Sequence, residues 1–285
     1  MATKKTGTSA KKKTGAKPKV TKTTKVTTVK AVESGSSRLA GSIKGGFLRM
    51  PVAGAALAEF IGAFLLATTV LIIHNEPFYM FIALIGIFMM VGGISGAHVN
   101  PAITVGAWVT RRINSVRALS YLAAQFLGAM LALVAMTAFV DQAPEVSAEA
   151  ASLGRTAPQL FSVDLETLAE GKEQAVLFAE IIGVAILGFA YASVLRPRVN
   201  NKVMGAFTVG GAGFIAMAFA STVASYVGAK AVLSPATALT VKAVDFSNMN
   251  SWSLAIYVVA PLIGAVIGFF LHDLLESAEA DQKLA

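Results

Sequence analysis

Two short motifs in this sequence hold residues that could handle a small polar molecule. They are Asn100-Pro101-Ala102 and Ser234-Pro235-Ala236. Each begins with a residue type that caps helices well, followed by a proline that suits the first helical position. A helix start carries about half a positive charge, so two starts meeting tip to tip would repel cations and turn the oxygen of a passing water toward them. The expected chemistry is therefore the passage of neutral polar molecules.

The apolar stretch that follows each proline covers only two to three helical turns, half the depth of a bilayer. Around them the sequence holds six longer apolar runs of roughly 18–23 residues, enough to cross a hydrocarbon core of ~30 Å as helices. These runs are 51–73, 78–95, 118–140, 174–195, 203–224 and 251–272. We expect an all-α membrane protein with six transmembrane helices and two re-entrant half-helices. Many of its glycines should let helices approach closely, among them Gly62, Gly128, Gly183, Gly210, Gly211, Gly264 and Gly268.

The composition supports this class and excludes several others. Of 285 residues, 55% are hydrophobic, 14% are charged and none is cysteine. A soluble domain has about 25% charged residues, and a disulfide-stapled module or a thiolate metal site needs cysteine. The sequence shows no nucleophile–base pair, metal-ligand cluster or phosphate loop, so we expect neither an enzyme nor a cofactor.

The chain repeats itself with inverted topology. Ala58-Glu59-Phe60-Ile61-Gly62 resembles Ala179-Glu180-Ile181-Ile182-Gly183, and the two proline motifs match 134 residues apart. A third match, at an offset of 136 residues, joins the runs beginning at Ala124 and Ala260. Each unit, about 51–140 and 174–272, holds three spans and one half-helix. Because three is odd, the second unit is upside down relative to the first, a layout that places a pathway near the membrane midplane. The half-helices should meet there and line a narrow aqueous pore.

The basic charge belongs to the N-terminal end. Residues 1–50 hold 13 of the 24 lysines and arginines and one acidic residue. We expect 1–45 to be a disordered tail, since it lacks aromatic residues and enough apolar surface to fold. It could be only a solvated, orienting tail, or it could contact anionic lipid or nucleic acid. Residues 46–275 would form the channel domain and 276–285 a short C-terminal tail. Placing the tail side in the cytoplasm puts 20 basic residues there and 4 outside, so we expect both termini in the cytoplasm and the protein in the cell membrane.

The sequence resembles the major intrinsic proteins, the aquaporins and aquaglyceroporins. The resemblance rests on the stretch from Ser95 to Ala102, on the Ala-Glu-Phe opening of the first span and on the Pro-Leu-Ile-Gly run of the last, and it covers about residues 50–275. It implies a homotetramer with one pore per subunit. It also implies that Asn100 donates a hydrogen bond to the solute, that Pro101 and Ala102 stack against Pro235 and Ala236, and that buried Glu59 and Glu180 brace the re-entrant loops. His98 is interpreted as a packed or loop-bracing side chain, because no second histidine has metal-ligand spacing.

Two departures from the family pattern affect selectivity. Ser234 stands where the family usually has asparagine, and a hydroxyl offers one donor instead of two. Thr237 stands where the family has the arginine that narrows the outer constriction. Counting without gaps, the other constriction positions are Met80, Thr222 and Ala231. This set has no cation, which implies a wider and more permissive filter than that of a strict water channel.

Two alternatives to a passive channel for water or small neutral solutes such as glycerol remain open. Glu59 and Glu180 are ionisable groups at membrane depth, where such groups often mark proton or ion pathways, so a coupled carrier is one. A membrane-anchored interaction protein with a vestigial pore and a partner-binding tail is the other.

Overall fold

The computed structural model describes residues 51–73, 76–140, 147–154, 171–196, 201–245 and 250–282. Within these ranges every regular element is helical. Six helices are long and apolar enough to cross a membrane. They are α2 (Pro51–Ile73), α3 (Pro77–Ser95), α5 (Ser115–Val140), α7 (Glu173–Val194), α8 (Lys202–Tyr226) and the run of α10 (Ser251–Leu254), η1 (Ala255–Val259) and α11 (Ala260–Gln282). The predicted all-α membrane fold is confirmed, whereas the tail predicted for 1–45 lies outside the described residues.

Two shorter helices begin at the proline motifs. α4 (Pro101–Val109) starts after Asn100, whose side-chain oxygen accepts a hydrogen bond from the Ala102 N–H at 2.9 Å. α9 (Pro235–Thr240) starts after Ser234, whose side chain makes no capping bond. A further short helix, α6 (Ala148–Ser152), lies between the repeats. α11 continues past residue 272, the predicted end of the last span, because the polar residues that follow form helix readily.

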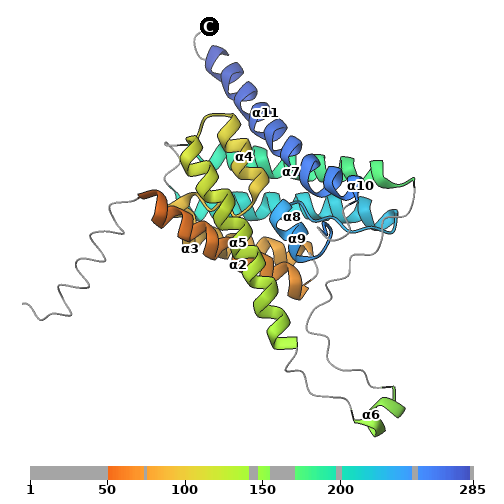
Figure 1. Ribbon diagram of the computed structural model, residues 1–285. Coiled ribbons are helices and arrows are strands. Elements are labelled where there is room, and N and C mark those ends of the chain that lie inside the picture. Colours follow the sequence, from red (N-terminus) through yellow and green to blue (C-terminus); the bar gives the residue numbers. More distant parts are fainter. Residues whose placement is uncertain are drawn as a thin grey trace, which may run out of the picture. The chain divides into compact units, whose positions relative to one another are not determined.

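The packing repeats as the sequence does (Figure 1). α2 packs against α5 and α3 in the first repeat, and α7 packs against α11 and α8 in the second. The half-helices exchange partners: α4 packs against α11, the last span of the other repeat, and α9 packs against α5. This exchange brings the two helix starts into the space between the repeats.

Small residues permit the closest of these contacts. A Cβ atom added at Gly128 would lie 2.3 Å from the Phe60 carbonyl oxygen, and one added at the matching Gly264 would lie 2.3 Å from that of Ile181. Backbones can approach this closely only without a side chain. Gly211 was also expected to let two helices approach closely. This expectation is wrong, because no atom lies within 4 Å of a Cβ added there.

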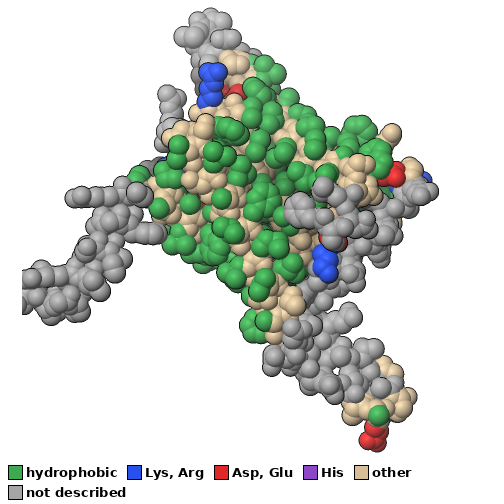
Figure 2. Space-filling model, in the orientation of Figure 1, with side chains coloured by type: hydrophobic (Ala, Val, Ile, Leu, Met, Phe, Trp, Pro, Cys, Tyr) green, Lys and Arg blue, Asp and Glu red, His purple; other side chains and the backbone are tan. Residues whose placement is uncertain are grey.

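The outer surface of the helices is apolar. Figure 2 shows one face on which hydrophobic side chains predominate and charged ones are few. Large exposed side chains include Met90, Ile94, Leu127 and Val134, each more than 60% exposed. A contiguous apolar surface of this kind suits contact with lipid.

Candidate functional site

Two buried carboxylates hold the loops that lead into the half-helices. Glu59 on α2 accepts hydrogen bonds from the backbone N–H groups of His98, at 2.9 Å, and Val99, at 2.6 Å. Glu180 on α7 accepts from Val232, at 2.6 Å, and Leu233, at 2.9 Å. Both glutamates are fully buried. Each carboxylate therefore accepts hydrogen bonds from loop N–H groups that have no acceptor within a helix.

The loop residue before each motif has a left-handed backbone. Val99 has a φ of 44° and Leu233 a φ of 60°, values that are costly for bulky residues. A glycine three residues after each glutamate makes room for them: an added Cβ would lie 2.3 Å from Val99 Cγ1 at Gly62 and 2.6 Å from Leu233 Cδ2 at Gly183. The repeated Glu-x-x-Gly pattern thus has two functions on one helix face, a carboxylate that binds the loop and a gap that receives its side chain.

The first loop has additional polar support. Gln125 on α5 donates to Glu59 at 2.7 Å and to the Thr104 hydroxyl at 2.8 Å. The Thr104 hydroxyl also lies 3.2 Å from Nδ1 of His98. The matching positions in the second repeat are Pro261 and Ala238, which have no polar side chain. The two loops therefore share one backbone geometry but not one hydrogen-bond network.

The two motifs meet. The Asn100 side chain donates a hydrogen bond to the Leu233 carbonyl at 2.8 Å, directly beside Ser234. Asn100 and Ser234 are both buried and line the same cavity. The Ser234 hydroxyl is buried without a hydrogen-bond partner among the described residues. A buried hydroxyl in this state costs free energy unless another molecule binds to it.

The cavity wall is built from pairs that the repeat relates. The cavity has a volume of about 30 Å³, room for about two waters. For each residue that lines the cavity, the residue at the matching position of the other repeat also lines it. The pairs are Leu66 and Leu187, Val70 and Tyr191, Met80 and Gly213, Leu84 and Met217, His98 and Val232, Val99 and Leu233, Asn100 and Ser234, and Ile103 and Thr237. The cavity therefore lies on the pseudo-two-fold axis.

Only part of the predicted constriction set lies on this wall. Met80 and Thr237 do. Ala231 is buried but does not line the cavity. Thr222 is exposed, and its hydroxyl donates to the Ala218 carbonyl at 2.7 Å. Thr222 comes five residues after the cavity-lining Met217, so it lies about 140° away around the helix.

The remaining motif residues are buried beside the cavity rather than on its wall. Pro101 and Ala102 begin α4, and Pro235 and Ala236 begin α9. Ala236 packs in a cluster with Ala67, Ala129 and Ala132. These residues place the helix starts, whereas Asn100 and Ser234 face the cavity.

Sequence reasoning missed the apolar and aromatic part of the wall. Leu66, Val70 and Tyr191 were not singled out, although each lies on a span that carries a repeated motif. The offset of 121 residues between the first and fourth spans relates Val70 to Tyr191 and could have identified the pair. Nothing in a single sequence says that this helix face points inward.

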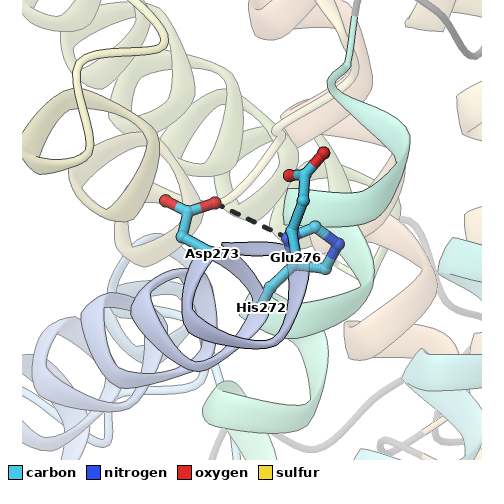
Figure 3. Close-up of side chains that lie close together, drawn as sticks. All are labelled: His272, Asp273 and Glu276. Atoms are coloured by element: carbon cyan, nitrogen blue, oxygen red, sulfur yellow. Dashed lines mark ion pairs between the residues drawn. The ribbon is translucent and has the colours of Figure 1, made fainter. Parts of the chain in front are cut away.

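A cluster on α11 gathers three titratable side chains (Figure 3). His272, Asp273 and Glu276 offer ligand atoms within 4.8 Å of one another. Each carboxylate is already paired with an arginine: Arg112 binds Asp273 through two bonds of 2.6 and 3.2 Å, and Arg196 pairs with Glu276. Arg196 also lies 3.0 Å from the His272 ring. With two guanidinium groups present, the cluster fits an ion-pair network that ties the segments after α4 and α7 to α11.

Comparisons with known proteins agree with this architecture. The family model described as "Major intrinsic protein" matches residues 47–272. A probable aquaporin from Oryza sativa subsp. japonica is 31% identical over 208 residues, which cover 70% of this chain and 65% of that protein, just under two thirds of its length. A glycerol uptake facilitator protein-like 6 from Lactiplantibacillus plantarum is 28% identical over 233 residues, covering 78% of this chain and 98% of that protein. The X-ray structure of the aquaglyceroporin from Plasmodium falciparum has a TM-score of 0.59 and 17% identity, covering 81% of this chain and 99% of that one, and so shares the fold.

Proposed function

The chain belongs to the major intrinsic protein family, and from that premise we propose that it is a passive channel for water and small neutral solutes such as glycerol. The family consists of channels rather than enzymes, and six apolar helices make the chain a multi-pass membrane protein. The observation that carries the proposal is the meeting of Asn100 and Ser234 at a buried cavity between the repeats. The similarity to a glycerol uptake facilitator supports including glycerol.

The polarity of the cavity supports a neutral solute. No lysine, arginine, aspartate or glutamate is among the described residues that line the cavity. Most of the wall is apolar, and its polar side chains are those of His98, Asn100, Tyr191, Ser234 and Thr237. A water or a polyol could bind to the free Ser234 hydroxyl while it passes the apolar side chains, whereas an ion would lose its hydration without compensation.

Glu59 and Glu180 act as structural acceptors in this proposal rather than as proton carriers. Each carboxylate accepts two backbone N–H groups. Protonation would weaken the hold on loops that already have left-handed residues. These bonds favour a channel over a coupled carrier.

The decisive experiment is stopped-flow light scattering on proteoliposomes challenged in turn with water, glycerol, urea and ammonia. A passive channel should speed volume change with a low activation energy and no ion gradient. Flux that requires a proton or ion gradient would instead establish the carrier. Removing residues 1–45 should leave the permeability intact, whereas an interaction protein with a vestigial pore would show none in either form.

Arginine at position 237 should restore a tighter filter. Thr237 lines the cavity and its hydroxyl donates to the Ser234 carbonyl at 3.0 Å, so it offers little to a solute. We expect Thr237→Arg to reduce glycerol permeability several-fold more than water permeability, because a long cation narrows the passage. Thr237→Val, which keeps the size without the hydroxyl, is the control. Equal losses for both solutes in the arginine variant would show that position 237 does not select.

The Ser234 hydroxyl should matter for flux and not for folding. It caps nothing and has no partner among the described residues, so Ser234→Ala should leave the melting temperature unchanged or slightly raise it. Water permeability should fall several-fold, because the solute loses a hydrogen-bond partner in an apolar passage. A parallel Thr240→Ala variant removes a buried hydroxyl that donates to the backbone carbonyl of Thr237 at 2.8 Å. Thr240 does not line the cavity, so this variant should lower the melting temperature with little effect on flux.

The proposal extends to the orientation of the chain in the membrane and to its oligomeric state. The excess of basic residues on the side of the N-terminus supports both termini in the cytoplasm of a cell-membrane protein. The family supports a homotetramer with a pore in each subunit. The basic segment 1–45 would serve either as a solvated, orienting tail or as a contact with anionic lipid or nucleic acid.

A further inference from the structure

The two sides of the cavity differ most at one pair of residues. Val70 and Tyr191 hold matching places in the two repeats, and both line the cavity. Val70 lies near the end of α2 and Tyr191 near the end of α7. Because the repeats are inverted, these helix ends lie on opposite sides of the plane where Asn100 and Ser234 meet.

Tyr191 lies on the side toward which α4 runs. Arg112, just after α4, and Arg196, just after α7, both pair with side chains on the C-terminal part of α11. The end of α7 and the end of α4 therefore reach the same side. The Tyr191 hydroxyl also donates to the Ala97 carbonyl, in the loop before α4, at 2.7 Å. We call this the α4 side and the other, with Met80 and Thr237, the α9 side.

The aromatic groups on the α4 side are held firmly. Tyr191 is 2% exposed, and its ring meets the His98 ring at an interplanar angle of 78° with 6.4 Å between centroids. The His98 ring is held in turn by Thr104 at Nδ1 and by the ring of Tyr121, 5.3 Å away. With Nδ1 engaged, Nε2 is the remaining hydrogen-bonding atom of the imidazole. Two rings whose polar atoms are held by hydrogen bonds fix the width of a passage more firmly than flexible side chains do.

Among the described lining residues, the α9 side has no equivalent pair of rings. Val70 replaces the tyrosine, Val232 matches His98, and Met80 is a flexible thioether. The Thr237 hydroxyl already donates its proton to the backbone. The side chains that can restrict width and offer a fixed polar contact are therefore gathered on the α4 side.

We propose that Tyr191 and His98 form the size-selecting constriction of this pore, on the α4 side of the two motifs. The ring of Tyr191 limits the width, and the imidazole of His98 presents the polar contact to a passing hydroxyl. This inference rests on the proposed channel function. It would place selection by size on the opposite side of the two motifs from Thr237.

The test replaces Tyr191 with its repeat counterpart. Tyr191→Val, reconstituted in phosphatidylcholine–phosphatidylglycerol vesicles, should raise the ratio of glycerol to water permeability several-fold over the original protein. Tyr191→Phe keeps the ring and should keep the ratio. Tyr257→Val is the matched control: it removes a buried tyrosine of the second repeat that donates to the Lys230 carbonyl at 3.0 Å and does not line the cavity.

The outcomes separate the constriction from the channel itself. A ratio unchanged in Tyr191→Val, or raised equally in Tyr257→Val, overturns the constriction while the original protein still conducts. If the original protein conducts nothing, the proposed function fails instead. Size-exclusion chromatography checks that each variant is folded, and Tyr191→Leu replaces the valine variant with the same expected rise if valine is not tolerated.

Discussion

Glu180→Leu should remove most of the water and solute permeability and lower the melting temperature strongly. The substitution leaves the N–H groups of Val232 and Leu233 buried without an acceptor, at about 1–3 kcal/mol each. It also releases Leu233 from the left-handed conformation at φ 60° in which its carbonyl accepts the hydrogen bond of Asn100. Proteoliposome shrinkage and thermal unfolding in detergent measure the two effects.

Glu180→Gln is the graded control for this loss. The amide keeps one acceptor oxygen but turns an NH₂ group toward the second backbone donor, so the destabilisation should be about half as large. The same pair of changes at Glu59 should cost more, because Gln125 also donates to that carboxylate at 2.7 Å. A leucine variant at 180 with unchanged melting temperature and flux would contradict the bracing role proposed for the glutamates.

Gly264→Ala should destabilise the protein by about 2–3 kcal/mol, at the upper end for one added methyl group in a packed core. The new Cβ would lie 2.3 Å from the Ile181 carbonyl oxygen, which belongs to the backbone of α7 and cannot rotate away. α7 and α11 must then separate, and α7 carries both Glu180, which binds the second loop, and the cavity-lining Tyr191. Melting temperature and the yield of monodisperse protein report the effect.

Gly211→Ala provides the comparison within the same membrane environment. No atom lies within 4 Å of an added Cβ there, and alanine favours helix by roughly 0.8–1 kcal/mol over glycine. We expect unchanged or slightly increased stability. Equal destabilisation at positions 211 and 264 would show that glycine acts through something other than the close approach of α7 and α11.

The scaffold was predictable from local signals. Apolar run length, a capping residue before a proline and a repeated motif are each read over a few neighbouring residues. They led to the six spans, to the two half-helices beginning at Pro101 and Pro235, and to the inverted repeat. In a bilayer these signals are strong, because every spanning segment must satisfy its backbone within itself.

The wall of the cavity was less predictable. Gap-free counting from the motifs selected Met80, Thr222, Ala231 and Thr237 as a constriction. Of these, Met80 and Thr237 line the cavity, whereas Thr222 is exposed on α8. Counting along a chain gives a position and not the phase of a helix relative to its neighbours. That phase is set by packing between distant segments, such as Gly210 on α8 against Phe81 on α3.

The sequence by itself determined that this chain is a helical membrane protein with two opposed half-helices, because length, apolarity and capping are properties of contiguous residues. Only the tertiary structure decided that the Ser234 hydroxyl has no hydrogen-bond partner among the described residues, that Tyr191 and Val70 both line the cavity, and that Arg112 and Arg196 pair with α11. Each of these depends on which side chains meet across helices far apart in sequence. Such meetings follow from the relative rotation and depth of packed helices, which no local pattern encodes.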